Sequence, residues 1–321
     1  EQYNVGTMDP GIGYTSADQK ELPFVGAPNT SDYDITLNTD NEGWNFIANP
    51  YTAAIDLSLF INTTTNPSIT GAIYLWDDGG SKQGQRTNAD FVTVNNSGAV
   101  GGSGGSGATY NDYIGTAQGF FVQASSAGVV SFEETMRSAN QNEDGAFFRT
   151  KHIDRFTLQI ADQNFAKDEL LVAFRNEGSA GFDPSFDASK FYLTKKLAIA
   201  SLSPEGRPLA IQTLGSLVDR NEAISIPLTV DVAEQGECTL SISANEMPDS
   251  YEIYLLDKVE QSSLDLARDV TIQVNPGDND RFELLIDHEN FHPILGAEES
   301  LPLKAFVLNQ DLNIMEHPIA G

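Results

Sequence analysis

Apolar and polar residues alternate along most of this chain, in short runs separated by Gly, Asn, Asp and Pro. A period of two is typical of half-buried β-strands, and the separating residues favour turns. The first runs are "YDITL", "GWNFIAN", "AIYLW", "FVTV", "QGFFVQA", "VVSF", "RFTLQI" and "ELLVAF". A second set consists of "KLAIAS", "PLAIQT", "ISIPLTV", "CTLSIS", "YEIYLL", "VTIQV" and "RFELLI". The pattern predicts an all-β protein.

Helical periodicity is nearly absent from the chain. Its best candidate, "SSLDLARD", spans barely two turns. A helix of that length is not stable by itself in water.

The spacing of the runs predicts two β-sandwich domains. About seven short strands within about a hundred residues are typical of an immunoglobulin-like sandwich, and residues 195–290 fit that pattern. Residues 1–194 carry larger loops, which favours a jelly-roll-like sandwich. Residues 291–321 form a linker and a strand-like tail, in which "KAFVLN" and "LNIM" regain the alternation.

Aromatic residues occur within the predicted strands. In "GWNFIANPYTAAID", we expect a strand to begin at Gly43, and Trp44 and Phe46 to point inward from it. Trp44, Trp76, Phe120 and Phe121 are expected to fill cores. An alternative stays open, because 18 Phe, 10 Tyr and 2 Trp are enough to line a sugar-binding platform.

The chain is strongly acidic. It has 46 Asp and Glu against 18 Lys and Arg, for a formal net charge of -28. Such a surface repels phosphate backbones and anionic lipid, which excludes nucleic acid and membrane surfaces as partners. It attracts cations, so calcium is a candidate, although a soluble surface explains the charge more simply. No apolar run reaches the roughly 18 residues of a transmembrane helix.

One pair of carboxylates is a candidate calcium site. Asp183 and Asp187 flank a proline-containing turn in "GFDPSFDASKF" and could both reach a hard cation. Asp side chains also cap turns, and we prefer that interpretation. "LWDDGGS" and "NTDNEG" are likewise interpreted as turns, and no other cofactor is expected.

The segment "DHENFHP" contains H-E-x-x-H, the pattern of zinc peptidases. That pattern binds zinc only on a helix, where His288 and His292 would share a face. Here it continues the strand-like "RFELLI", and Pro293 disfavours helical geometry at His292.

The glycine tract "AVGGSGGSGAT" matches nucleophile and dinucleotide patterns through composition alone, and is expected to be a surface loop. We therefore predict a protein that is not an enzyme.

The single cysteine, Cys238, lies in the alternating run "ECTLSIS". It is expected to be a small buried apolar residue. The chain starts at Glu1 without a methionine or a signal-like segment, which suggests a processed or excised piece of a longer protein.

Several motifs are more individual than composition explains. "GWNFIANPYTAAID" is followed by "ITGAIYLWDDGGS", "YNDYIGTAQGFFVQA" and "VVSFEETMR". Together these resemble a segment of large secreted surface proteins of Bacteroidota that are exported by the type IX secretion system. The matched positions of the first motif are Gly43, Trp44, Asn45, Asn49, Pro50, Tyr51, Ala54, Ile55 and Asp56. The likeness covers roughly Gly11 to Ile286.

The tail "LNQDLNIMEHPIAG" is similar to the opening of that family's C-terminal sorting domain. His317 and Pro318 stand where the family has asparagine and proline. The resemblance implies a secreted protein at the outer cell surface, and it does not imply one activity.

Two hypotheses follow from the sequence. The first is a non-enzymatic structural or adhesive cell-surface protein, whose partners are other copies of itself or other surface proteins. Its copies could polymerise by strand addition through "KAFVLN" or the N-terminal "EQYNVG". The alternative is a carbohydrate-binding module that recognises an extracellular polysaccharide.

Overall fold

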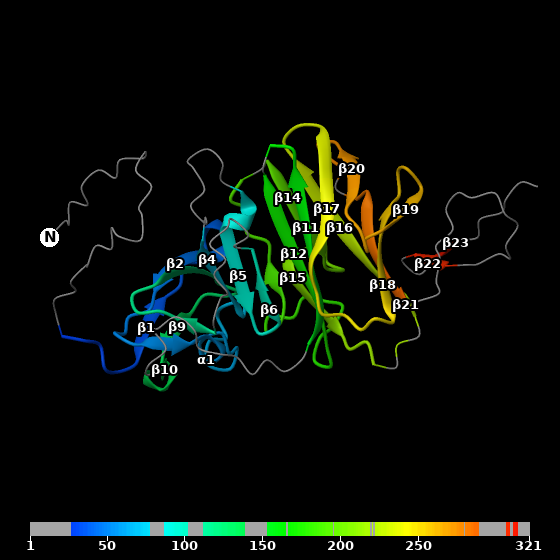
Figure 1. Cartoon of the computed structure of the whole chain (residues 1–321). Helices are drawn as coiled ribbons and strands as arrows, with labels where there is room; N and C mark the ends of the chain where they lie inside the picture. The colour runs from blue at the N-terminus through cyan, green and yellow to red at the C-terminus, as the bar shows by residue number, and fades with distance from the viewer. Residues whose placement is uncertain are drawn as a thin grey trace, which may run out of the picture.

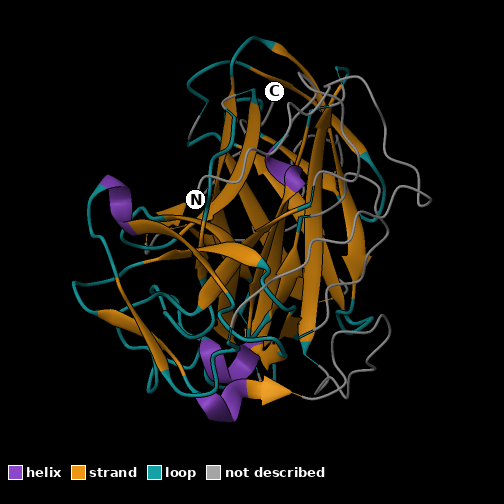
Figure 2. Cartoon of the chain, turned by 90° about the vertical axis from the view of Figure 1, so that its left-hand side faces the viewer, coloured by secondary structure: helices purple, strands orange, loops and turns teal. Residues whose placement is uncertain are grey.

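A computed structural model describes residues 27–77, 87–101, 112–138 and 153–288, apart from positions 165, 195, 219, 221 and 279, and the backbone of 306–308 and 311–313. Nearly all regular structure is β-strand (Figure 1). Figure 2 shows how few helical turns accompany the strands; the one α-helix described is α1 (Leu57–Phe60). The all-β prediction is confirmed. No described helix is long and apolar enough to cross a membrane.

The first unit is built on a five-stranded antiparallel sheet. In spatial order its strands are β2 (Trp44–Ala48), β8 (Gly119–Gln123), β4 (Ala72–Trp76), β5 (Phe91–Asn95) and β6 (Gly98–Val100). Two smaller sheets complete the unit. One pairs β1 (Tyr33–Thr36) with β9 (Val129–Phe132), and the other orders β10 (Arg137–Ser138), β3 (Ala54–Asp56) and β7 (Tyr113–Ile114).

One apolar core fills the space between these sheets. Alternate residues of the large sheet, such as Ile47, Val122 and Ile73, point into it. Phe60 and Phe132 come from the opposite side, with ring centroids 4.9 Å apart. Burying side chains of this size contributes about 1.5–3 kcal/mol each, which makes this core the main stabilising feature of the unit.

The second unit is one long sheet folded over its own core. Its main path is β19 (Ser262–Asp265), β18 (Tyr251–Asp257), β21 (Phe282–His288), β16 (Ile224–Val232), β14 (Leu197–Leu202), β15 (Pro208–Gly215), β12 (Lys167–Arg175), β11 (Asp154–Asp162), β17 (Gly236–Asn245) and β20 (Val270–Val274). A short strand, β13 (Ala188–Ser189), also pairs with β15. The path turns at the β14–β15 hairpin, where only Ser201–Leu209 and Leu202–Pro208 are paired. The sheet thus forms a sandwich around one core.

Cys238 lies in this core with 2% of its surface exposed, as the sequence predicts. Its neighbours include Leu240 and Ile272. Burial raises the pKa of the Cys238 thiol to about 11, so the side chain stays protonated at neutral pH.

The structure corrects the boundary expected at Thr194. β11 and β12 both pair within the sheet of the second unit, so the sheets divide before Asp154. The strand pattern alone could not show this, because β12 joins β15 across a long and parallel connection. A second correction concerns "SSLDLARD", the best helical candidate. Ser262–Asp265 is strand β19, because it pairs with β18 along its length.

The two units lie next to one another along the long axis of the molecule (Figure 1). β1 lies near one end of this axis and β21 lies near the other. Beyond β21, the strand-like tail contains β22 (Phe306–Leu308) and β23 (Asp311–Asn313), which form an antiparallel pair.

Asn49 holds together the Asn-Pro-Tyr turn that follows β2. Its side-chain nitrogen lies within hydrogen-bond distance of three carbonyl oxygens, those of Ala53, Ile114 and Gly115. Its side-chain oxygen accepts from the backbone N–H of Tyr51 at 3.0 Å. Asn49 is 3% exposed. Water therefore cannot replace its side chain as the hydrogen-bond partner of these backbone groups.

We expect Asn49→Ala to lower the free energy of unfolding by about 1–3 kcal/mol, because it leaves buried backbone groups unpaired. The matched control is Asn62→Ala, which removes an exposed amide that accepts from Thr64 N–H. It should cost about 0.5 kcal/mol or less. Denaturant unfolding followed by fluorescence checks both values. Equal effects would contradict the role given to Asn49.

Candidate functional site

The outer face of the five-stranded sheet carries a row of aromatic side chains. Phe46 on β2 lies opposite Phe121 on β8, and Phe121 lies opposite Tyr74 on β4. One step along, Trp76 on β4 lies opposite Phe91 on β5. Because side chains alternate between the faces of a sheet, these rings all point away from the first core.

The second unit covers one part of this row. Trp44 meets Tyr74 edge-on, with ring centroids 4.8 Å apart, and meets Phe191 edge-on at 4.6 Å. Leu171 and Ile211, from β12 and β15, pack into the same apolar cluster. Edge-on aromatic contacts are favourable and fix the relative orientation of the rings. This part of the row therefore belongs to the joint between the two units.

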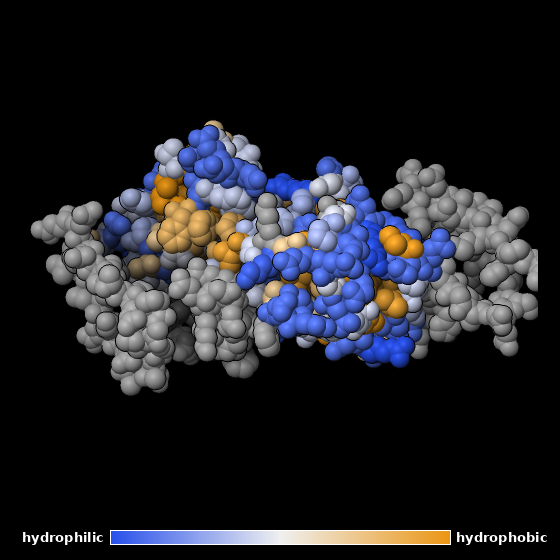
Figure 3. All heavy atoms as spheres, turned by 90° about the horizontal axis from the view of Figure 1, so that it is seen from above, coloured by the Kyte–Doolittle hydropathy of each residue, from blue (hydrophilic) through white to orange (hydrophobic). Residues whose placement is uncertain are grey.

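The other part of the row is open to solvent. Phe46 is 66% exposed and Trp76 is 43% exposed. Gly119 lies on β8, between their strands, and a Cβ atom there would be 2.5 Å from the tip of the Phe46 ring, so a larger residue would require that ring to move. Figure 3 shows an apolar patch on this unit amid hydrophilic surface. We name Phe46, Phe121 and Trp76 the open aromatic patch.

These positions correct the expectation that Trp44, Phe46, Trp76 and Phe121 point into the core of a sandwich, because Trp44 lies at the joint and the other three form the open aromatic patch. Ile47 is the residue of β2 that faces the first core, which places Phe46 on the outer side. Phe120 is buried as predicted, at 1% exposure. The sequence signal for an outward row was the double-sided apolar pattern of "NFIA" and "GFFV", in which adjacent residues are both apolar.

Polar contacts fix the joint beside the aromatic rings. Asn88 uses its full hydrogen-bonding capacity there, since its oxygen accepts from Leu193 and Thr194 N–H and its nitrogen donates to the carbonyls of Thr194 and Leu197. Asn88 is 4% exposed. A buried amide with all its partners present specifies one arrangement of the two units.

The turn between β5 and β6 makes a second set of contacts. Arg175 donates to the carbonyl of Asn96 at 2.6 Å, and Thr213 donates to the hydroxyl of Ser97 at 2.8 Å. Directly after β6, the N–H of Gly101 donates to a carboxylate oxygen of Glu169 at 2.9 Å. The joint is therefore a packed interface that combines apolar and polar contacts, and the two units are not connected merely by a linker.

The predicted calcium ligands Asp183 and Asp187 are close together. The two Asp187 carboxylate oxygens accept from the backbone N–H groups of Thr213 at 2.6 Å and of Asp183 at 2.7 Å. Asp183 accepts from Ser185 N–H at 3.1 Å. These contacts match the turn-capping interpretation, and Asp187 also ties this turn to β15. Calcium binding at the pair stays a prediction.

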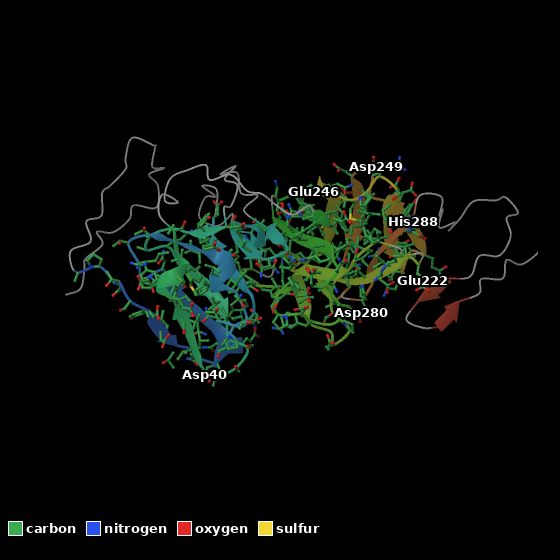
Figure 4. All side chains as sticks on the ribbon, turned by 90° about the horizontal axis from the view of Figure 1, so that it is seen from below. Asp40, Glu222, Glu246, Asp249, Asp280 and His288 are labelled. Carbon is green, nitrogen blue, oxygen red and sulfur yellow. The ribbon has the colours of Figure 1, made fainter. Side chains whose placement is uncertain are left out.

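The remaining acidic groups are dispersed. Figure 4 labels Asp40 on the first unit, and Glu222, Asp249 and Asp280 spread over the second. Within the described residues, no group of three or more His, Cys, Asp and Glu side chains could hold a metal ion.

His288 is the last residue of strand β21, as the strand pattern predicts (Figure 4). One ring nitrogen lies 2.7 Å from the carbonyl oxygen of Arg220, and the ring stacks on Tyr251 at 4.3 Å. The zinc pattern requires a helix at this point. Glu289 and His292 lie outside the described residues, as do Asp78 and most of the glycine tract.

The second unit has two strand edges. Its sheet path begins at β19 and ends at β20, so each has one side without a strand neighbour among the described residues. A hollow of about 350 Å³ between these edges is lined by residues of both, including Leu264, Asp265 and Val270. Unpaired edges offer backbone groups to another strand.

A protein family described as a domain of unknown function (DUF8693) matches residues 5–285. No curated protein and no solved structure matches the chain.

The pKa of Asp187 is raised by burial to about 7, against the lowering effect of its backbone hydrogen bonds. Between its ordinary value of 3.8 and about 7, the folded state holds a proton that the unfolded chain has released. The contribution of Asp187 to the free energy of unfolding therefore decreases as pH rises through this window, and is constant above it.

We expect Asp187→Asn to remove this decrease. The variant should be less stable at every pH, because its amide nitrogen meets a backbone N–H, but its stability should fall less steeply between pH 4 and pH 7 than that of the natural protein. Urea unfolding across this pH range measures both curves. Parallel curves would rule out Asp187 as the titrating group.

Proposed function

Because the chain belongs to the DUF8693 family, whose description assigns no activity, we propose a function from its own surfaces: a non-enzymatic structural and adhesive module of the outer cell surface. The observation that carries the proposal is the open aromatic patch on a rigidly joined pair of sandwiches. Exposed apolar patches rimmed by polar residues mark interaction sites.

The form of the joint supports a structural role. A flexible linker would let the two units reorient, and the patch would then have no fixed direction relative to the second unit. Here the side chains of Asn88, Arg175 and Thr213 connect the units through buried or half-buried hydrogen bonds. The joint holds the aromatic patch in a fixed orientation with respect to the second unit.

Secretion through the type IX system in Bacteroidota is part of the proposal. This part rests on the resemblance of the sequence motifs to those secreted surface proteins. Two residues of the first motif have structural roles in the fold. Gly43 has a φ of +78°, and a Cβ there would lie 2.5 Å from the carbonyl oxygen of Ala124. Asn49 holds the following turn. Such residues stabilise a fold and do not determine which ligand the surface binds.

A neutral polysaccharide is the second candidate partner. Phe46 and Trp76 stand two strands apart, across β8, and Trp76 is two residues beyond the position opposite Phe46, which separates their backbones by about 12 Å. Rings at that separation can stack on successive apolar faces of a sugar chain. The net charge of -28 disfavours polyanionic glycans.

We expect Phe46→Ala and Trp76→Ala each to weaken adhesion by about tenfold or more, since exposed aromatic anchors dominate binding energy. The measurement is binding of the purified chain to intact cells and to a panel of neutral polysaccharides. The control is Val218→Ala, which truncates a side chain that is 74% exposed and lies outside the patch. Soluble polysaccharide that competes with cell binding would assign the partner as sugar. Unchanged binding in both aromatic variants would show that the open aromatic patch is not the binding surface.

Polymerisation by strand addition is the structural form of this proposal. The edges β19 and β20 would accept a strand from the tail of another copy, with "KAFVLN" as the donor. We expect the whole chain to form oligomers that increase with concentration, and a chain ending at residue 290 to stay monomeric. Light scattering after size-exclusion chromatography measures both, with a scrambled tail as control. Equal oligomerisation by all three chains would contradict tail donation.

A further inference from the structure

A lysine and an aspartate are buried in direct contact beside the joint. Lys190 directly follows β13, and Asp168 lies on β12. The Lys190 Nζ atom lies 2.6 Å from Asp168 Oδ1, and the two side chains are 5% and 2% exposed. The same space is lined by apolar residues, such as Phe91 and Phe191, and by polar ones, such as Asn88 and Glu169.

A second lysine–carboxylate pair has a similar contact distance but is exposed to solvent, so burial is what distinguishes the Lys190–Asp168 pair. Lys258 Nζ lies 2.8 Å from Glu283 Oε1, but the Lys258 side chain is 42% exposed. Water therefore solvates the Lys258 ammonium, as in an ordinary surface ion pair. Lys190 has no comparable access to water. The two pairs therefore have similar contact distances, but the ammonium is buried in one pair and solvated in the other.

Burial disfavours the charged form of the Asp168 carboxylate. It raises the pKa of Asp168, against the lowering effect of Lys190 and of two backbone N–H groups. A proton can pass directly between Nζ and Oδ1 across the 2.6 Å contact. The product is a neutral amine next to a neutral carboxylic acid, which are the two forms required for condensation.

We propose that Lys190 and Asp168 are joined by an intramolecular amide bond. The lone pair of Lys190 Nζ attacks Asp168 Cγ, and a new N–C bond forms. The Cγ–Oδ1 bond breaks, and Oδ1 leaves as water, carrying the acid proton and one amine proton. No oxidant, metal or other reactant takes part.

The surroundings supply what this step needs. The N–H of Ile199 donates to Asp168 Oδ2 at 2.7 Å, so a donor already faces the oxygen that becomes negative in the tetrahedral intermediate. The carbonyl of Glu169 accepts from Lys190 Nζ at 3.2 Å and holds the amine in place. Fixed contact raises the effective concentration of the reacting groups, and exclusion of water favours condensation over hydrolysis.

The bond would lie within the second unit, directly beside the joint. It ties β12 of the second unit to the segment that carries Phe191, whose ring packs against Trp44 and Phe91 of the first unit. Pulling the first unit away would then load the contacts of Phe191, while the covalent link keeps the segment that carries Phe191 attached to β12. This goes beyond the proposed function, and it holds or fails independently of what the aromatic patch binds.

The test is the intact mass of the purified full chain under denaturing conditions. We expect a mass about 18 Da below that of the sequence, one water lost through a covalent modification. A tryptic map should contain residues 168–175 linked to residues 176–195, with no cleavage after Lys190. A measured mass equal to the mass calculated from the sequence, in protein shown to be folded by circular dichroism, would overturn the proposal.

Two matched variants locate the bond. Lys190→Arg keeps the cation and the ion pair but removes the nucleophile, and it should restore the full mass. Lys258→Arg makes the same change at the solvated pair and should keep the loss. If the loss persists in Lys190→Arg, it arises elsewhere, such as by cyclisation at Glu1, and the proposal fails. The tryptic map of the natural chain locates the bond without any variant. Misfolding of a variant would therefore still leave the proposal tested.

Discussion

Contact between the outer face of the five-stranded sheet and strands β12 and β15 is the constraint on which the molecule depends. Tyr74 shows why. It points away from the first core and is nevertheless fully buried, and its hydroxyl donates to the carbonyl of Ser189 at 2.8 Å. Without the second unit, this ring and its neighbours would be exposed, and such a surface would associate with any apolar partner. The two sandwiches are therefore stable as one body.

The same sheet face serves two purposes. Its covered part holds the units together through Trp44, Tyr74 and Phe191, and its open part presents Phe46 and Trp76 to solvent. The covered part fixes the strands that carry the open part. A binding surface on a sheet is more rigid than one on loops, so little entropy is lost when a partner binds.

Cations are scarce in this chain, and several are placed at the joint. The sequence has 18 Lys and Arg. Arg155 donates to the carbonyl of Ser97, Arg175 donates to the carbonyl of Asn96, and Arg207 donates to the side chain of Gln123. In an acidic molecule, two units repel each other unless cations or hydrogen bonds offset the repulsion. Placing cations between the units offsets it where the distance between them is shortest.

The sequence by itself determined the strand content, because period-two alternation follows directly from the geometry of the β-strand. It also determined the buried state of Cys238 and Phe120, the turn around Asp183 and Asp187, and the strand at His288. Only the tertiary structure decided which face of β2 is inner, since "NFIA" is apolar on both faces and alternation cannot separate a core from an interface. The contact between Lys190 and Asp168 and the pairing of β12 with β15 likewise join distant residues. Such contacts depend on how the sheets fold over each other, which no local pattern records.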